Sequence, residues 1–287
     1  MSGLRVLKGH GTENDFVLIP DLDGGLELTD DLVRALCDRH TGVGADGVLR
    51  VVRSEQTAEA RHCAATAPYF MDYRNADGSI AEMCGNGVRV FARYLQWSGL
   101  LGEATAVLIA TRGGPRQVEL TPDGLITVEM GVPRLLDQRP LVTVPGLSGA
   151  VAGFALEIPN PHVVVEVADR STLDGLRLDS PPVVEPALPT GQNVEFITRI
   201  APDRLAMRVH ERGVGETRSC GTGICAAAVS AAMTGGGSGA GGQWWVDVPG
   251  GTCRVSWTAD GGVLLSGPAV LVAEIELEPG WLVAAGG

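Results

Sequence analysis

The chain has 287 residues, 45% of them hydrophobic and 20% charged, and its formal net charge is −12. This composition supports buried cores and excludes wholesale disorder, and the 40 glycines follow no Gly-X-Y period, which excludes collagen. The acidic balance disfavours nucleic acid and anionic membranes as partners, and no apolar stretch approaches the ~20 residues that span a bilayer.

Strand-like runs dominate the elements predicted along the chain, and helices are fewer. In the first half we expect strands at 4–7, 16–19 and 47–52, a helix at 31–38, a surface excursion at 54–68 and a helix after residue 84. In the second half we expect strands at 125–129, 163–167, 205–209 and 263–265, a short helix at 171–176, a helix after residue 220 and a glycine-rich connector at 234–242.

Two of the six cysteines share an unusual local context. Cys84 lies in Cys-Gly-Asn-Gly and Cys220 in Cys-Gly-Thr-Gly, and each motif opens an apolar helical run. The glycines allow a close approach to the first helical turn, where backbone N–H groups are unpaired. We therefore expect the helix dipole to lower the pKa of both thiols. The remaining cysteines are expected to be small buried hydrophobic residues: Cys37, Cys63, Cys225 and Cys253.

Several motifs occur in the same order in both halves of the chain. Residues 14–17 (Asn-Asp-Phe-Val) correspond to 160–163 (Asn-Pro-His-Val), and residues 44–48 correspond to 191–195. Asn75 precedes Cys84 by nine residues, and Glu211 precedes Cys220 by the same number. Such an order is typical of a duplicated unit.

The repeat predicts the architecture. We expect a mixed α/β fold with mostly antiparallel sheet, built as two pseudo-symmetric domains, each a sheet wrapped around a central helix, with the active site in the cleft between them. The first domain would comprise 1–121 and 267–287 and carry Cys84. The second would comprise 122–266 and carry Cys220.

Two thiols on opposite sides of one carbon can invert its configuration. An ionised thiol removes a proton while the other thiol supplies a proton to the opposite face. The N–H groups at the helix N-termini receive the negative charge that builds on an adjacent carboxylate. Schiff-base chemistry is disfavoured, because the only lysine, Lys8, is expected to be a solvated strand end. The pattern predicts racemisation or epimerisation without a cofactor, and the Cys and His spacings predict no metal site.

Together these motifs resemble the diaminopimelate epimerase family. The resemblance rests on residues 8–16, 75–79, 83–87, 160–162, 191–193 and 210–223, and it extends from about residue 4 to residue 277. It implies interconversion of L,L-diaminopimelate and meso-diaminopimelate, a small-molecule reaction in the synthesis of lysine and peptidoglycan precursors. It also implies a homodimer. Because the N-terminus has no apolar signal core, we expect the protein to be cytoplasmic.

The resemblance implies roles for individual residues. Cys84 and Cys220 would be the catalytic acid–base pair, and His162 and Glu211 would tune their pKa values. Arginine and amide donors suit the nonreacting carboxylate of such a substrate, and a buried glutamate suits its ammonium. The substrate-binding positions would be Asn14, Asn75, Gly85, Asn86, Asn160, Asn193, Glu211, Arg212, Gly221 and Thr222.

Three positions depart from the family pattern. Gly47 stands where many members carry glutamine, and Glu13 adds a charge before Asn14. Ala273 stands where some relatives carry a tyrosine associated with dimerisation.

Other interpretations remain open at this point. A proline-type racemase of the same fold would use the same thiols, although it has no use for a second carboxylate anchor such as Arg212. A thiol redox or metal-responsive protein would use paired cysteines without catalysis. Taken alone, Asn14, Asn160 and Asn193 are also typical of turns, and His210 is typical of a structural histidine.

Overall fold

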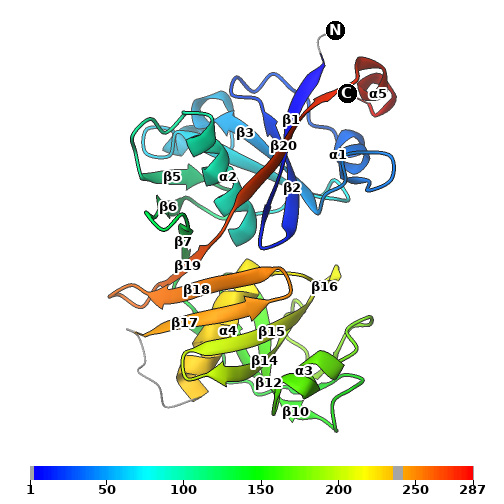
Figure 1. The fold of residues 1–287 in the computed structure, drawn as a ribbon, viewed down its shortest axis with the longest axis vertical. Coiled ribbons are helices and arrows are strands. Elements are labelled where there is room, and N and C mark those ends of the chain that lie inside the picture. Colours follow the sequence, from blue (N-terminus) through cyan, green and yellow to red (C-terminus); the bar gives the residue numbers. More distant parts are fainter. Residues whose placement is uncertain (1–2, 235–241, 287) are drawn as a thin grey trace. The chain divides into compact units, whose positions relative to one another are not determined.

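Figure 1 follows the chain through a computed structural model, which describes residues 3–234 and 242–286. The chain divides into two compact units: unit 1 is Met1–Val128 with Pro268–Gly287, and unit 2 is Glu129–Gly267. We expected the first boundary at residue 121. Residues 122–128 stay in unit 1 because Leu120 pairs with Ile126 and Val118 with Val128 in an antiparallel hairpin.

Unit 1 is built on a mixed sheet that includes both ends of the chain. In spatial order its strands are β20 (Val270–Leu277), β1 (Leu4–Gly11), β2 (Asn14–Pro20), β3 (Gly47–Arg53), β4 (Tyr69–Asn75), β5 (Ala106–Ala110), β6 (Arg116–Leu120) and β7 (Ile126–Gly131), the last of which continues into unit 2. The pairs β2–β3 and β4–β5 are parallel, and the other pairs are antiparallel.

Unit 2 is built on a second mixed sheet. In spatial order its strands are β8 (Arg134–Leu135), β11 (Phe154–Glu157), β12 (Pro161–Glu166), β14 (Asn193–Ala201), β15 (Arg204–Glu211), β17 (Gln243–Val248), β18 (Gly251–Trp257) and β19 (Val263–Gly267). The short β16 (Gly215–Thr217) also pairs with β15. A separate small sheet joins β10 (Val151–Ala152), β9 (Leu141–Thr143) and β13 (Val183–Glu185).

The two main sheets follow the same pattern. Apart from the short β16, the described strands of each sheet form a series of eight in which the third and fourth are parallel, the fifth and sixth are parallel, and all other neighbours are antiparallel. The mixed α/β class and the predicted duplication are therefore confirmed. The register pairs Phe16 with Gly47 and His162 with Asn193, so the strand residue equivalent to Asn193 is Gly47. Our alignment of 44–48 with 191–195 was therefore one residue out of step along the strands.

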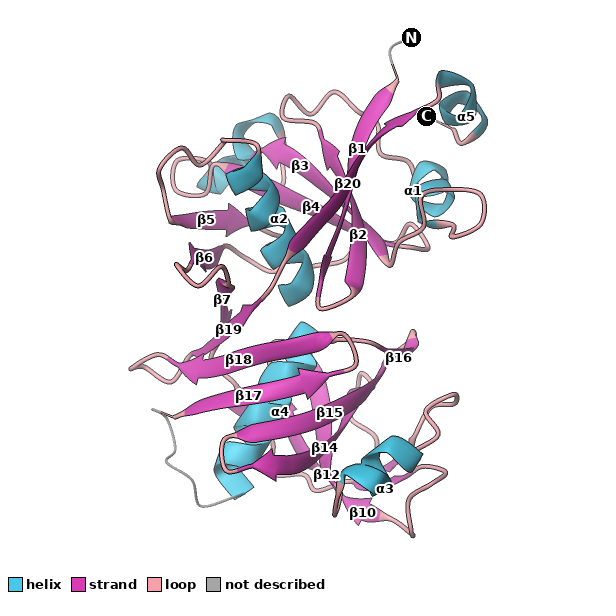
Figure 2. Cartoon of the chain, in the orientation of Figure 1, coloured by secondary structure: helices cyan, strands magenta, loops and turns pink. Residues whose placement is uncertain are grey.

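Each sheet curves around one helix (Figure 2). In unit 1, α2 (Gly85–Trp97) contacts β1, β2, β3, β4, β6 and β20. In unit 2, α4 (Gly221–Thr234) contacts β11, β12, β14, β15, β17, β18 and β19. The α4 sequence is apolar nearly all round and rich in alanine, as a helix enclosed by strands requires. Both helices were predicted to begin directly after their cysteines, and this is confirmed.

The remaining helices are short and lie outside the two enclosed positions. They are α1 (Asp30–Cys37), α3 (Arg170–Gly175) and α5 (Pro279–Ala284), with two 3₁₀ turns at Ser54–Gln56 and Arg61–Cys63 inside the expected surface excursion. Side chains of Thr29 and Asp169 cap α1 and α3 by accepting N–H bonds from Leu32 and Thr172. The expected connector at 234–242 lies almost entirely outside the described residues.

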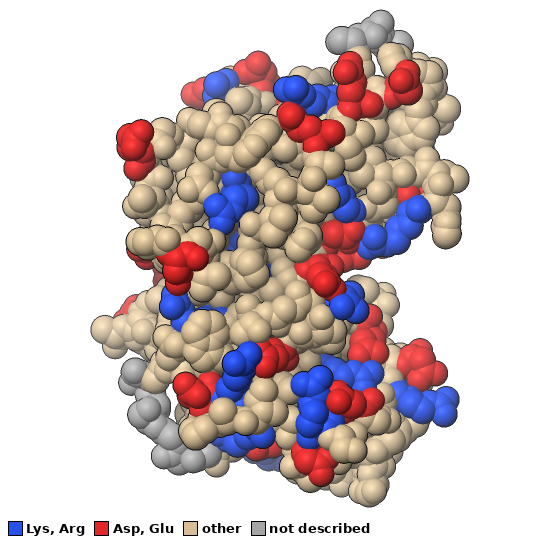
Figure 3. All heavy atoms as spheres, viewed as in Figure 1, with Lys and Arg blue, Asp and Glu red and all other residues tan. Residues whose placement is uncertain are grey.

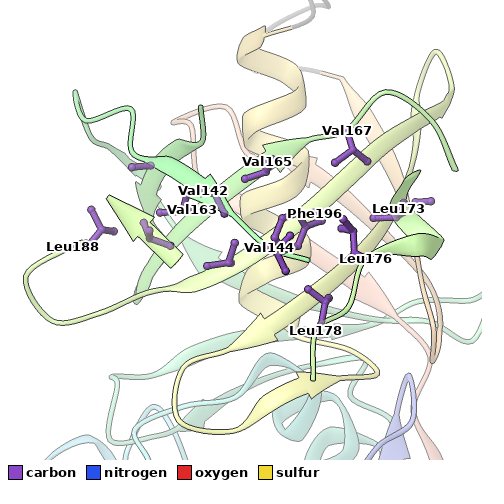
Figure 4. Packing of buried hydrophobic residues seen from close by; sticks show 14 residues of the cluster. Val142, Val144, Val163, Val165, Val167, Leu173, Leu176, Leu178, Leu188 and Phe196 are labelled. Carbon is purple, nitrogen blue, oxygen red and sulfur yellow. The ribbon is translucent and has the colours of Figure 1, made fainter. Parts of the chain in front are cut away.

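A second apolar layer covers the face of the unit 2 sheet that α4 does not touch. Figure 4 shows Val163, Val165 and Phe196 of this face packed with Leu173 and Leu176 from the region of α3. Because side chains alternate along a strand, His162, which precedes Val163, and Glu195, which precedes Phe196, point to the opposite face, the one that α4 covers. This alternation decides which side chains reach the first turn of α4.

The surface carries both signs of charge. On the face seen in Figure 3, acidic and basic side chains are interspersed. Some of the charged side chains form pairs, such as Arg208 and Glu216, whose Nε and Oε1 atoms are 2.8 Å apart. Among the described residues, no helix is long and apolar enough to cross a membrane.

Candidate functional site

Cys84 caps the N-terminus of α2. Its backbone is extended (φ −140°, ψ 121°), and its Sγ accepts a hydrogen bond from the N–H of Gly87 at 3.5 Å. The sulfur thus occupies the place of a capping oxygen, beside the backbone N–H groups of Gly85 and Asn86 in the first turn. A negative charge on this sulfur, or on a ligand beside it, is favoured by the helix dipole.

Asn14 and Asn86 lie against the Cys84 thiol. The thiol donates to Asn14 Oδ1 at 3.6 Å, and Asn86 Nδ2 donates to the same oxygen at 3.2 Å. Arg89, which is fully buried, donates to Asn86 Oδ1 at 2.7 Å. The structure therefore brings together three of the predicted residues of unit 1 and fixes the orientation of both amides.

A charged network lies behind Asn14. Asp46 Oδ2 accepts from Asn14 Nδ2 at 2.8 Å, and Arg39 pairs with both Asp46 and Asp15 at 2.8 Å. Lys8 Nζ lies 2.5 Å from Asp15 Oδ2, and its side chain is only 18% exposed, so the expectation of a solvated lysine was wrong. Burial raises the pKa of Asp15, but its hydrogen bonds to Arg39 and Lys8 outweigh burial and hold this pKa well below the usual range.

Gly47 is explained by the close approach of strand β4. A Cβ at this position would lie 2.5 Å from the Arg74 carbonyl oxygen and 2.9 Å from Tyr73 Cε2. No side chain fits there without a shift of the backbone, so the glutamine of many family members has no room in this chain.

Asn75 is the remaining predicted side chain of unit 1. It ends β4, and its Nδ2 donates to Ser79 Oγ at 3.0 Å across the turn that follows. Its side chain is partly exposed.

Cys220 directly precedes α4 and is 6% exposed. Its Sγ lies 3.4 Å from the hydroxyl of Thr222, in the first turn with Gly221. The thiol also donates to the carboxylate of Glu211, whose Oε1 accepts from the Thr217 hydroxyl at 2.5 Å. Cys220 is therefore in contact with two of its predicted partners.

The pKa of Cys220 departs from our expectation. Burial raises it well above its ordinary value, and the carboxylates of Glu211 and Glu195 raise it further; the hydroxyl of Thr222 and the N–H of Gly223 act in the opposite direction but do not prevail. Burial raises the pKa of Glu211 as well. The prediction of a lowered pKa was therefore wrong for Cys220, because burial outweighs the helix N-terminus, and the protonated thiol is favoured there.

His162 is fully buried beneath the first turn of α4. Its Nδ1 lies 2.7 Å from Glu195 Oε1, and its Nε2 lies 3.0 Å from Asn160 Oδ1. Glu195, also 0% exposed, was not predicted as a site residue. A glutamate in the apolar run Val194–Ile197, at the strand position that faces the helix, was the available signal.

Asn193, the first residue of β14, and Arg212, which directly follows β15, form a separate pair. Asn193 Oδ1 accepts from the backbone N–H of Arg212 at 2.9 Å, and the Arg212 guanidinium donates to the Thr190 carbonyl oxygen. Arg212 is exposed, whereas Asn193 is buried, and His210 lies one residue before Glu211 on β15. Within the described ranges 3–234 and 242–286, no group of three or more His, Cys, Asp or Glu side chains could hold a metal ion.

Comparison with known proteins identifies the family. The family model described as "Diaminopimelate epimerase" matches residues 6–136 and 154–272. A diaminopimelate epimerase of Streptomyces coelicolor is 49% identical over 285 residues, covering 97% of this chain and 97% of that protein. The corresponding protein of Thermobifida fusca is 51% identical, covering 94% of this chain and 97% of that protein.

The chain belongs to the diaminopimelate epimerase family. The diaminopimelate epimerase family consists of cofactor-independent epimerases, so the chain is an isomerase and the interpretation as an enzyme is confirmed. Solved structures share the fold at much lower identity. A PhzF-family protein of Bacillus anthracis has a TM-score of 0.73 at 16% identity, covering 97% of this chain and 100% of that one. A hydroxyproline epimerase of Agrobacterium vitis has a TM-score of 0.67 at 14% identity, covering 97% and 95%.

Burial and pKa together predict unequal reactivity of the cysteines. Thiolate is the form that iodoacetamide attacks. The pKa of Cys37 is raised by burial to about 12 and that of Cys220 is also raised, so at pH 8 both are thiols, and both are nearly inaccessible. We expect the native protein at pH 8 to be alkylated at the partly exposed Cys84 before either of them, as measured by peptide mass spectrometry. Labelling of Cys220 as fast as Cys84 would contradict this assignment.

Glycine at position 223 is required by Glu195. A Cβ there would lie 2.6 Å from Glu195 Oε1, whereas a Cβ at the equivalent Gly87 would meet the flexible end of Leu49 at 3.2 Å. We expect Gly223→Ala to lower the free energy of unfolding by about 1–3 kcal/mol and Gly87→Ala to cost less, as measured by urea denaturation. In a Glu195→Ala background the cost of Gly223→Ala should largely disappear. If Gly223→Ala lowers the free energy of unfolding equally in the unsubstituted protein and in Glu195→Ala, the explanation is wrong.

Proposed function

We propose that this chain interconverts L,L-diaminopimelate and meso-diaminopimelate, with Cys84 and Cys220 as its acid–base pair. The observation that carries the proposal is the equivalent placement of the two cysteines, each at the start of the helix that its own sheet encloses. Membership of the family supports the choice of substrate.

In the proposed reaction the two thiols act on opposite faces of one α-carbon. A thiolate takes the α-proton, and the electron pair of the broken C–H bond delocalises into the adjacent carboxylate. The other thiol then gives its proton to the opposite face, so that one sulfur ends protonated and the other ionised. The reverse reaction restores the starting protonation states.

The environments of the two sulfurs suit complementary starting states. The raised pKa of Cys220 favours its thiol, which is the acid form. Cys84 accepts the N–H of Gly87 at the helix N-terminus, an arrangement that favours a thiolate. Negative charge on the reacting carboxylate would be stabilised by backbone N–H groups at Gly85 and Asn86 and at Gly221 and Thr222.

The substrate carries a second amino-acid group, which needs its own partners. We assign binding of the substrate's polar groups to the amides of Asn14, Asn75, Asn160 and Asn193, to the Arg212 guanidinium and to the Glu211 carboxylate. Arg212 is exposed and keeps guanidinium donors beyond its bond to Thr190, which supports recognition of a carboxylate. Glu211 and His162 would also tune the thiols, and His162 would do so through its neighbours.

The proposal includes the setting of the reaction. We assign the chain to the synthesis of lysine and peptidoglycan precursors in the cytoplasm, with no nucleic acid or membrane as partner and with no cofactor or metal. A homodimer remains part of the proposal, although Ala273, which lies exposed on β20, replaces the tyrosine of some relatives.

A proline-type racemase is the second candidate, because a hydroxyproline epimerase has the same fold at 14% identity. Arg212 and the amides argue for a substrate with two amino-acid groups. Assays of proline and diaminopimelate side by side distinguish the two, and turnover of proline alone reverses the assignment.

The thiol assignment predicts the outcome of three substitutions. Cys84→Ala and Cys220→Ala should each lower kcat/KM for diaminopimelate by about 10³-fold, because each removes a proton donor or acceptor. Cys225→Ala, a control on the buried face of α4, should retain activity. Circular dichroism would verify that all three variants fold. Normal turnover by either of the first two would count decisively against the assignment.

A further inference from the structure

Two fully buried ionisable side chains lie beneath the first turn of α4. Glu195 on β14 and His162 on β12 are both 0% exposed, and their Oε1 and Nδ1 atoms are 2.7 Å apart. Their strands are parallel neighbours, with Val164 opposite Glu195 and His162 opposite Asn193. Glu195 reaches so far under the helix that only glycine fits at position 223.

Unit 1 carries apolar residues at the equivalent positions. The strand registers make Phe16 equivalent to His162 and Leu49 equivalent to Glu195. The surroundings of the two helix glycines agree with this: a Cβ at Gly87 would meet Leu49, Phe16 and the Cys84 Cβ, and a Cβ at Gly223 would meet Glu195 and the Cys220 Cβ. The same architecture therefore forms with an apolar pair, so the fold does not require the charged one.

The charged pair is also unfavourable for stability. Burying a carboxylate is costly unless its oxygens are hydrogen-bonded, and Glu195 Oε2 has no partner among the described residues. A pair that the fold does not need and that leaves a buried oxygen unsatisfied points to a role in the chemistry of the site.

The contacts of His162 define that role. Both ring nitrogens face oxygens that accept hydrogen bonds, Glu195 Oε1 and Asn160 Oδ1. One proton shared between Glu195 Oε1 and His162 Nδ1, together with a proton on Nε2, makes both contacts hydrogen bonds. Glu195 thus fixes the orientation of the ring and leaves the Nε2 proton directed at Asn160, much as a carboxylate orients a catalytic imidazole.

The orientation of Asn160 follows from the same bond. Because Asn160 Oδ1 accepts a hydrogen bond from His162, the Nδ2 atom of Asn160 points the other way. Within residues 3–234 and 242–286, this nitrogen donates to no protein acceptor. Asn160 is partly exposed, so this N–H₂ group is available to an acceptor on a ligand.

We propose that Glu195 is a positioning residue of the Cys220 site: it holds the His162 ring with its Nε2 proton toward Asn160, and this bond holds Asn160 with its amide N–H₂ group turned toward the substrate. The part that concerns substrate rests on the function proposed above, whereas the orientation of His162 does not. The other groups around the pair are Glu211 on β15 and the Cys220 thiol before α4. The effect of Glu195 on the pKa of both agrees with its closeness to them.

Nitrogen NMR of ¹⁵N-histidine-labelled protein tests the state of His162 directly. The chain has 5 histidines, and His162→Gln identifies the signals of this one. At pH 8 Nε2 of His162 should appear protonated in the unsubstituted protein, and this preference should be lost in Glu195→Gln, whose amide can either donate or accept at Nδ1. Glu166→Gln is the matched control, because it removes an exposed carboxylate, paired with Arg199, from the neighbouring strand. Glu195→Leu repeats the test with the residue that unit 1 carries at the equivalent position, Leu49.

Kinetics test the positioning role. We expect Glu195→Gln to lower kcat/KM by about 10²-fold, mainly by raising KM, because Asn160 loses its fixed orientation. Glu166→Gln should match the unsubstituted protein. An unprotonated Nε2 in the unsubstituted protein, an unchanged tautomer in Glu195→Gln, or unchanged KM in that variant overturns the proposal. Full activity of Cys220→Ala with the NMR result intact would instead remove the proposed function and leave the assignment of His162 standing.

Discussion

A sulfur atom at the first turn of an enclosed helix is the constraint on which the rest of each unit depends. The helix must be narrow enough to be surrounded by strands, which explains the alanines of α4, and its first turn must be free of side chains where strand residues approach. Cys84 then caps α2 and Cys220 precedes α4 in the same topological position. The duplication thus places two thiols at equivalent positions of two similar folds.

The two copies have diverged where chemistry requires it. Beneath Cys84 the strands place Phe16 and Leu49, and beneath Cys220 they place His162 and Glu195. A helix N-terminus alone favours a thiolate, but burial and two carboxylates outweigh it at Cys220 and raise its pKa. The protonation of Cys220 is therefore set by burial and by the carboxylates around it rather than by the Cys-Gly-x-Gly motif.

Local sequence patterns predict where the two enclosed helices begin. They do not predict contacts that depend on how neighbouring strands are aligned. Both helix starts follow from a glycine motif beside an apolar run, so they were predictable. The His162–Glu195 contact joins residues 33 apart through parallel strands, which no local pattern reveals. The strands β4, β5, β6, β17, β18 and β20 were missed. The boundary, which lies within β7, was expected too early because the β6–β7 hairpin crosses a turn that resembles a linker.

The central claim is that two different groups handle the proton on the two faces of one carbon. Incubation of L,L-diaminopimelate in deuterated water, stopped at low conversion, tests it most directly. The account predicts meso product that carries deuterium at the inverted centre, while the remaining L,L-isomer retains its α-hydrogen. Product that retains the α-hydrogen of the substrate would mean that a single group removes and returns the proton, and would contradict the account.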